Sequence, residues 1–186
     1  MIELITYRKN NKIKMSTGFV GFLLQETETL NDFRNVLIRY FGKKFKPQQY
    51  LHTTMIYLAN SYINDTEKLL RDDNFSNEIN KFKNAVCFFD KLQFIGNSLI
   101  LVYKFENPKL ADILANLTNK YERNRHSQYL HITIGSFSFD AKKTFQENYN
   151  TIVGNMLDDF TFTIEAPTVI SVDSEKKYCK YRDLQQ

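Results

Sequence analysis

The chain has 186 residues, of which 42% are hydrophobic and 15% aromatic, enough to form one packed globular domain. Its formal charge of +4 suits a polyanionic ligand without requiring one. No run of about 18 uncharged apolar residues occurs and the first residues lack a long apolar core, so we expect neither a membrane span nor secretion.

Strand and helix patterns alternate along the chain. In order they predict a strand at 17–24, a helix at 29–41, a strand at 50–58, a helix at 64–82, strands at 85–89 and 99–105, a helix at 107–121, a strand from 129, a helix at 140–156, and strands at 160–164 and 168–172. Thr29, Asn107 and Asp140 are the expected helix caps, and Gly96-Asn97 is the expected hairpin turn. This order predicts an α+β protein built from two similar halves.

Each half contains one copy of a short motif. His52-Thr53-Thr54 and His131-Ile132-Thr133 lie 131 − 52 = 79 residues apart and use two of the three histidines in the chain. Because both motifs lie in predicted strands, the His and the Thr two residues later point to the same face. Strict alternation would also place Ile56 and Gly135 on that face, although a bulge at Gly135 explains the glycine equally well.

Two histidines and two threonines suit metal-independent cleavage of a phosphodiester. One imidazole can accept a proton from the attacking hydroxyl while the other donates a proton to the leaving oxygen, since the ordinary pKa of histidine lies near neutrality. Each Thr hydroxyl can donate a hydrogen bond to a non-bridging phosphate oxygen. We therefore expect His52 and His131 to be the acid–base pair and Thr54 and Thr133 to hold the phosphate.

Further residues near the motifs are candidates for substrate binding. Lys46 and Arg125 belong to basic clusters that precede the two motifs and could attract an anion, although such clusters are also ordinary solvated loops. Tyr57, Tyr129 and Phe137 could stack on a base, or could belong to the core.

The sequence predicts no cofactor and no metal. No cluster of carboxylates or of Cys and His with metal-ligand spacing accompanies the motifs. Cys87 and Cys179 are far apart in the sequence, so we expect reduced thiols in an intracellular protein.

The paired His-x-Thr strands in this order of elements resemble the 2H phosphoesterase superfamily. The resemblance extends from Phe19 to Val172, and the segment from Phe88 to Tyr103 is similar to the strand pair that precedes the second half of that family. It implies one domain over residues 1–186, with two pseudo-symmetric lobes, two antiparallel sheets facing a central groove, and helices packed outside. It also implies that the His/Thr residues are catalytic.

The spacing of the motifs and the Asn-, Lys- and Ile-rich composition are most similar to the eukaryotic-viral 2′,5′-phosphodiesterases. That branch implies cleavage of 2′,5′-oligoadenylate, antagonism of RNase L, and a monomer in the cytoplasm of a host cell. Three alternatives stay open. The chain could act on 2′,3′-cyclic phosphates at RNA ends or in nucleotides, degrade cyclic oligonucleotide signals as a phage enzyme, or only bind RNA.

Overall fold

The structure is a computed structural model, which describes residues 17–24, 27–58, 69, 71–121, 130–172 and 178–183. The strands are β1 (Thr17–Leu23), β2 (Phe45–Pro47), β3 (His52–Tyr57), β4 (Val86–Ile95), β5 (Ser98–Phe105), β6 (His131–Phe137), β7 (Thr161–Thr163), β8 (Thr168–Val172) and β9 (Tyr178–Asp183). The helices are α1 (Glu28–Phe41), the 3-10 helix η1 (Gly42–Lys44), α3 (Asp73–Asn80), α4 (Lys109–Tyr121), α5 (Phe139–Glu147) and α6 (Tyr149–Val153). The predicted α+β class is confirmed.

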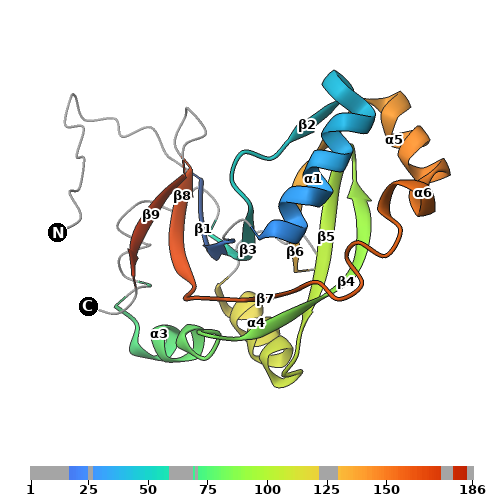
Figure 1. The fold of residues 1–186 in the computed structure, drawn as a ribbon. Helices are drawn as coiled ribbons and strands as arrows, with labels where there is room; N and C mark the ends of the chain where they lie inside the picture. The colour runs from blue at the N-terminus through green and yellow to red at the C-terminus, as the bar shows by residue number, and fades with distance from the viewer. Residues whose placement is uncertain are drawn as a thin grey trace, which may run out of the picture.

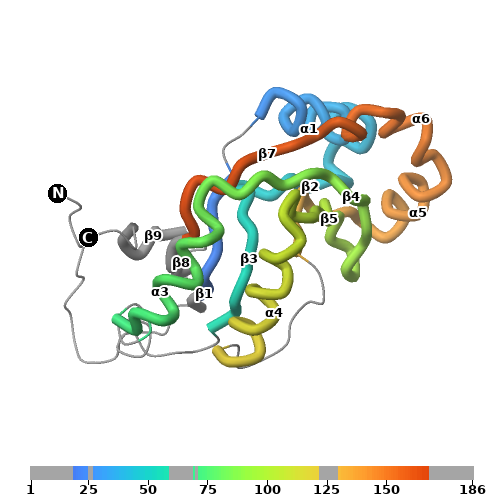
Figure 2. The backbone as a smooth tube through the Cα atoms, turned by 90° about the horizontal axis from the view of Figure 1, so that it is seen from below, coloured from blue at the N-terminus to red at the C-terminus, as the bar shows by residue number. Residues whose placement is uncertain are grey.

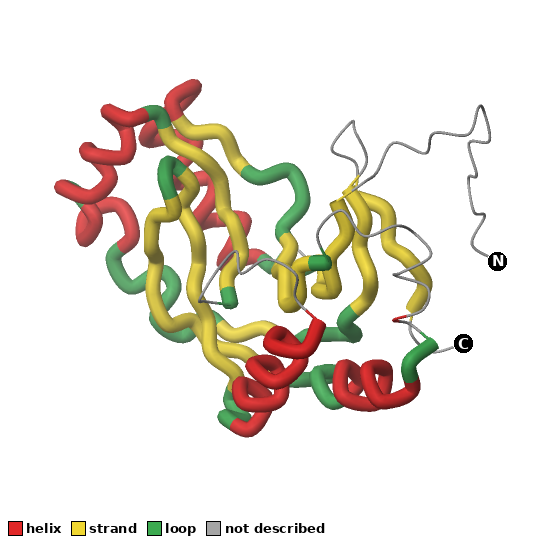
Figure 3. The backbone as a smooth tube through the Cα atoms, turned by 180° about the vertical axis from the view of Figure 1, so that it is seen from behind, coloured by secondary structure: helices red, strands yellow, loops and turns green. Residues whose placement is uncertain are grey.

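The strands form a curled antiparallel sheet in the order β7-β4-β5-β6-β3-β1-β8-β9, with β2 paired to β6 (Figure 1). The expected two sheets correspond to two arms of this sheet. One arm contains β7, β4, β5, β6 and β2, and the other contains β3, β1, β8 and β9. Figure 3 shows the arms on either side of the centre of the molecule. They are joined where β3 meets β6, at the pair Thr53 and Ile132.

The helices and one face of the sheet enclose a single hydrophobic core. α1 contacts β2 and α6, whereas α4 contacts β3, β5 and α3. Figure 2 shows α4 running beside β3. The apolar stripes of the two long helices contribute Leu30, Phe33, Leu37, Phe41, Leu110, Leu114 and Leu117 to this core. Among the described residues, no helix has the length and apolar content needed to cross a bilayer.

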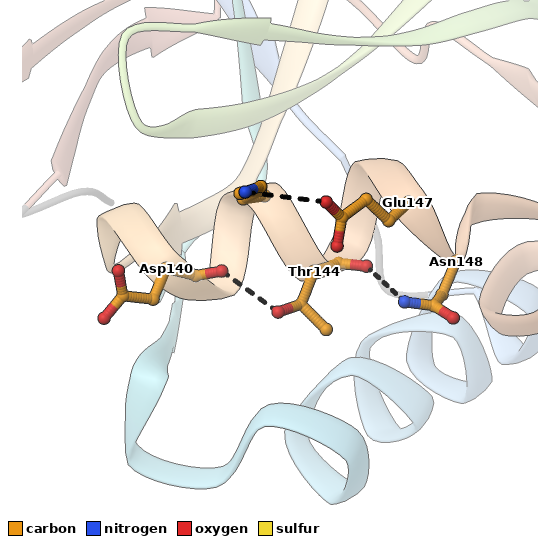
Figure 4. Close-up of polar contacts among 5 residues, drawn as sticks. Asp140, Thr144, Glu147 and Asn148 are labelled. Atoms are coloured by element: carbon orange, nitrogen blue, oxygen red, sulfur yellow. Dashed lines mark hydrogen bonds and ion pairs between the residues drawn. The ribbon is translucent and has the colours of Figure 1, made fainter.

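Local hydrogen bonds fix the helix ends, and two ends differ from the prediction. α1 is capped by Thr27, which accepts a hydrogen bond from the Leu30 amide at 3.3 Å, rather than by Thr29. α5 is capped by Ser138 rather than Asp140. Figure 4 shows Asp140 inside α5, where its carbonyl accepts a hydrogen bond from the Thr144 hydroxyl at 3.1 Å. The Asn107 cap and the Gly96-Asn97 turn are confirmed.

Other boundaries are shifted. The helix predicted at 64–82 is described only as α3 from Asp73, because most of the residues before it lie outside the described part of the chain. The predicted hairpin is longer, since β4 continues to Ile95. β2 and β9 were not predicted: β2 has only three residues, and β9 lies in a segment without clear alternation.

Candidate active site

The two motifs lie next to each other in the sheet and run antiparallel. Thr53 pairs with Ile132, so the register places His52 opposite Thr133 and Thr54 opposite His131. All four side chains of this tetrad (His52, Thr54, His131 and Thr133) are half-buried. Thr53 and Ile132 are 0% exposed and point to the opposite side, into the core. The tetrad therefore shares one face of the sheet, which we call the tetrad face.

A bulge follows the Thr of each motif. The β1–β3 register omits Met55, and the β5–β6 register omits Ile134, so each motif strand gains one residue relative to its neighbour. The bulges reverse the alternation beyond this point. Contrary to strict alternation, Ile56 is therefore 0% exposed and Gly135 is also buried. The residues five positions after each histidine, Tyr57 and Ser136, point to the tetrad face instead.

His52 is held by a backbone hydrogen bond. Its Nδ1 lies 3.1 Å from the carbonyl oxygen of Tyr50, which can only accept, so Nδ1 carries the proton and Nε2 carries the lone pair of the neutral ring. Burial lowers the pKa of His52 below 6.5; the Tyr50 carbonyl opposes this shift, and the charge of His131 adds to it. The neutral His52 ring is therefore suited to accept a proton at Nε2.

Phe19 forms one wall beside this imidazole. The centroids of the Phe19 and His52 rings lie 5.2 Å apart with an interplanar angle of 33°. Gly21, on the same strand, lies beneath the Phe19 ring: a methyl group there would overlap the Thr53 carbonyl oxygen and come within 3.2 Å of that ring. Phe19 is 3% exposed but lies outside the main core cluster, as expected for a buried side chain on the tetrad face.

Thr53 connects the two motifs on the core side of the sheet. Its hydroxyl donates a hydrogen bond to the backbone carbonyl of His131 at 3.1 Å. Thr53, Phe19 and Ser136 were not among the site residues predicted from the sequence. The sequence did contain a sign of the role of Thr53. This polar residue occupies a position predicted to face the core, where the other motif has Ile132.

No protein-family model matches the sequence, and a search of curated proteins also found no match. Solved structures are nevertheless similar in fold. The PDE domain of MHV ns2 has a TM-score of 0.52 and 14% identity over 85% of this chain and 99% of that domain. Kluyveromyces marxianus Usb1 with uridine monophosphate has a TM-score of 0.51 and 12% identity over 90% of this chain and 99% of that chain. Apo LigT from E. coli has a TM-score of 0.52 and 13% identity over 90% of this chain and 95% of that chain.

The chain has the 2H phosphoesterase fold. On this 2H fold, two of the five substrate-binding candidates lie on the tetrad face. Tyr57 is half-buried and pairs with Phe19, whereas Lys46 is exposed and pairs with Ser136. Arg125 lies outside the described residues, as does Tyr129.

Phe137 is placed in the core instead. It is 4% exposed, and its ring packs against Phe41, Phe45, Phe94 and Phe145 at centroid distances of 4.8 to 5.7 Å. The bulge before Gly135 turns Phe137 away from the tetrad face, so the Phe137 ring is not positioned to stack on a base there.

The described part of the 2H fold contains no group of three or more His, Cys, Asp or Glu side chains that could hold a metal ion. Cys87 is a buried free thiol in the core, and burial raises its pKa to about 12. It is therefore poorly suited to act as a nucleophile.

Proposed function

We propose that the chain is a metal-independent phosphodiesterase that cleaves 2′,5′-linked oligoadenylate by acid–base catalysis. The observation that carries this proposal is the pairing of Thr53 with Ile132, which brings both His-x-Thr motifs side by side on one face. Similarity in fold to the PDE domain of MHV ns2 supports a phosphodiester substrate. The Usb1 structure, which contains a uridine monophosphate, supports a nucleotide ligand.

In the proposed reaction His52 is the general base. Its Nε2 accepts the proton of the ribose 3′-hydroxyl next to the scissile 2′-phosphate, or of a water molecule. The lowered pKa of His52 keeps this nitrogen unprotonated at neutral pH. The hydrogen bond to the Tyr50 carbonyl fixes the orientation of the ring.

His131, as an imidazolium, is the general acid. When the 3′-oxygen forms its bond to phosphorus, the bond from phosphorus to the 5′-oxygen breaks, and His131 donates its proton to that leaving oxygen. Attack by the 3′-oxygen gives a 2′,3′-cyclic phosphate and a free 5′-hydroxyl, whereas attack by water gives a 2′-phosphate and the same 5′-hydroxyl. Thr54 and Thr133 donate hydrogen bonds to the non-bridging oxygens, where negative charge accumulates in the transition state.

A biological role follows from this substrate. Because 2′,5′-oligoadenylate activates RNase L, an enzyme that removes it in the cytoplasm of a host cell would prevent that activation. We propose this role for the chain as a viral protein.

The proposal is tested by incubating the protein with 2′,5′-linked oligoadenylate, 3′,5′-linked oligoadenylate and 2′,3′-cyclic AMP, followed by chromatography. We expect cleavage of the 2′,5′ linkage, unchanged by a chelator. Turnover of the cyclic nucleotide alone would overturn the substrate assignment. Loss of activity on chelation, restored by a divalent ion, would overturn the metal-independent mechanism.

A further inference from the structure

A second polar group lies on the tetrad face beyond Thr133. Ser136 of β6 pairs with Lys46 of β2 on one side and with Ser98 of β5 on the other. Cross-strand partners point to the same side of a sheet, so these side chains form one row across three strands. We call Lys46, Ser136 and Ser98 the polar row.

The alternation of β5 establishes which face carries the polar row. Leu99 and Leu101 belong to the core, so Ser98, Ile100 and Val102 point to the other face. Ile100 pairs with Thr133 and Val102 pairs with His131, which places Ser98 on the tetrad face. Ser136 reaches the same face because of the bulge in β6.

Backbone contacts fix the strands that carry the row. The Phe137 amide donates to the Asn97 carbonyl, and the Ser138 amide donates to the Lys44 carbonyl, both at 2.9 Å. The Lys142 ammonium group donates to the Gly96 carbonyl at 2.6 Å, which ties α5 to the β4–β5 turn. The row is therefore carried by paired strands rather than by a loop.

The chemistry of the row suits a phosphate. Lys46 supplies a positive charge and the serines supply two hydroxyl donors. Lys46 is exposed, and none of the ion pairs within the described residues includes it. Its charge is thus available to an incoming anion.

The spacing suits a neighbouring phosphate of the same substrate. On β5, Ser98 belongs to the polar row and Ile100 pairs with Thr133. These two residues are two positions apart, so the polar row lies about 7 Å from Thr133 along the strand. This is about the separation of successive phosphates in a nucleotide chain. In β3 the position equivalent to Ser136 is Tyr57, which pairs with Phe19 of β1. The substrate therefore meets an aromatic pair at one end of the site and the polar row at the other.

We propose that Lys46, Ser136 and Ser98 form a subsite for the phosphate adjacent to the scissile one, an inference that rests on the proposed function. The tetrad holds the reacting phosphate, and the polar row selects substrates that carry a second one. A linear oligonucleotide meets this requirement, whereas a 2′,3′-cyclic mononucleotide with one phosphate does not.

The first test measures turnover. The substrates are 2′,5′-linked diadenosine monophosphate and its forms phosphorylated at the 5′-hydroxyl of the first nucleoside or at the 2′-hydroxyl of the second. We expect one phosphorylated form to have a roughly tenfold higher kcat/KM, as one charge-assisted hydrogen bond would give. Lys46→Met should reduce this ratio to about one, and Lys46→Arg should retain it. Lys43→Met, which removes an equal charge from the exposed η1 turn, should also retain it.

The second test measures binding without turnover. We expect calorimetry to show adenosine 2′,5′-bisphosphate binding roughly tenfold more tightly than adenosine 5′-monophosphate, with the same response to the three variants. Equal affinities in the unmodified protein, or equal losses in Lys43→Met and Lys46→Met, would overturn the subsite. If no linkage is cleaved but the bisphosphate preference still depends on Lys46, the proposed function fails and the subsite stands.

Discussion

At the scale of single residues, the surroundings of His52 support its proposed role as the general base. Burial lowers the pKa of His52, and its Nδ1 is committed to the Tyr50 carbonyl. The Nε2 of His52 is therefore the better proton acceptor. In the proposed mechanism the proton donor is then His131.

The influence of His131 on His52 can be measured. In a His131→Gln variant the pKa of His52 should rise toward 6.5, because the neighbouring positive charge is removed. The chain has only three histidines, so NMR titration of their ring protons can be assigned with single variants. His126→Gln serves only to identify the signals of the third histidine. An unchanged His52 pKa in the His131→Gln variant would mean that the two imidazoles do not sense each other.

The lowered pKa also predicts how stability depends on pH. Below pH 6.5 the unfolded state takes up a proton at His52 while the folded state does not, so the free energy of unfolding falls as the pH falls toward the folded pKa. The slope from this residue is at most about 1.4 kcal/mol per pH unit. Urea unfolding between about pH 5 and 8 measures it. A His52→Asn variant should lose this component, and an identical slope in that variant would contradict the prediction.

At the scale of elements, the junction of β3 and β6 determines the geometry of the site. Thr53→Val should remove the hydrogen bond to the His131 carbonyl with little change in shape, and should lower stability by about 1 kcal/mol. Thr53 acts as a positioning residue, so we expect a roughly tenfold lower kcat with little change in KM.

Thr144→Val is the matched control for this prediction. It removes a similar hydroxyl-to-carbonyl hydrogen bond within α5 (Figure 4), an element that takes no part in the β3–β6 pairing. Its kcat should be unchanged. Equal kcat values for Thr53→Val and the unmodified protein would show that the hydroxyl does not position the site.

Part of the arrangement of helices and strands could be predicted from the sequence. The motif strands, the long helices and the Gly96-Asn97 turn follow from local patterns that the sequence contains. The bulges after Thr54 and Thr133 depend on pairing with strands distant in the chain, so alternation alone placed Ile56 and Gly135 on the wrong face. The placement of Phe137 in the core has the same cause.

At the scale of the whole molecule, both arms share one hydrophobic core, to which α1 and α4 both contribute. We therefore propose that residues 1–186 behave as one domain and unfold in a single cooperative transition. Far-UV circular dichroism and the fluorescence of the 11 tyrosines should give coincident urea transitions. Two separate transitions would mean that the arms are independent units.

The proposed mechanism requires both histidines to act on a single phosphate. The most direct measurement is the kcat of the His52→Ala, His131→Ala and double variants on 2′,5′-linked oligoadenylate. We predict that each single variant loses about 10²- to 10⁴-fold and that the double variant loses little more, because the two groups act as a unit. Single variants that retain activity within a few-fold, or losses that multiply in the double variant, would contradict the account.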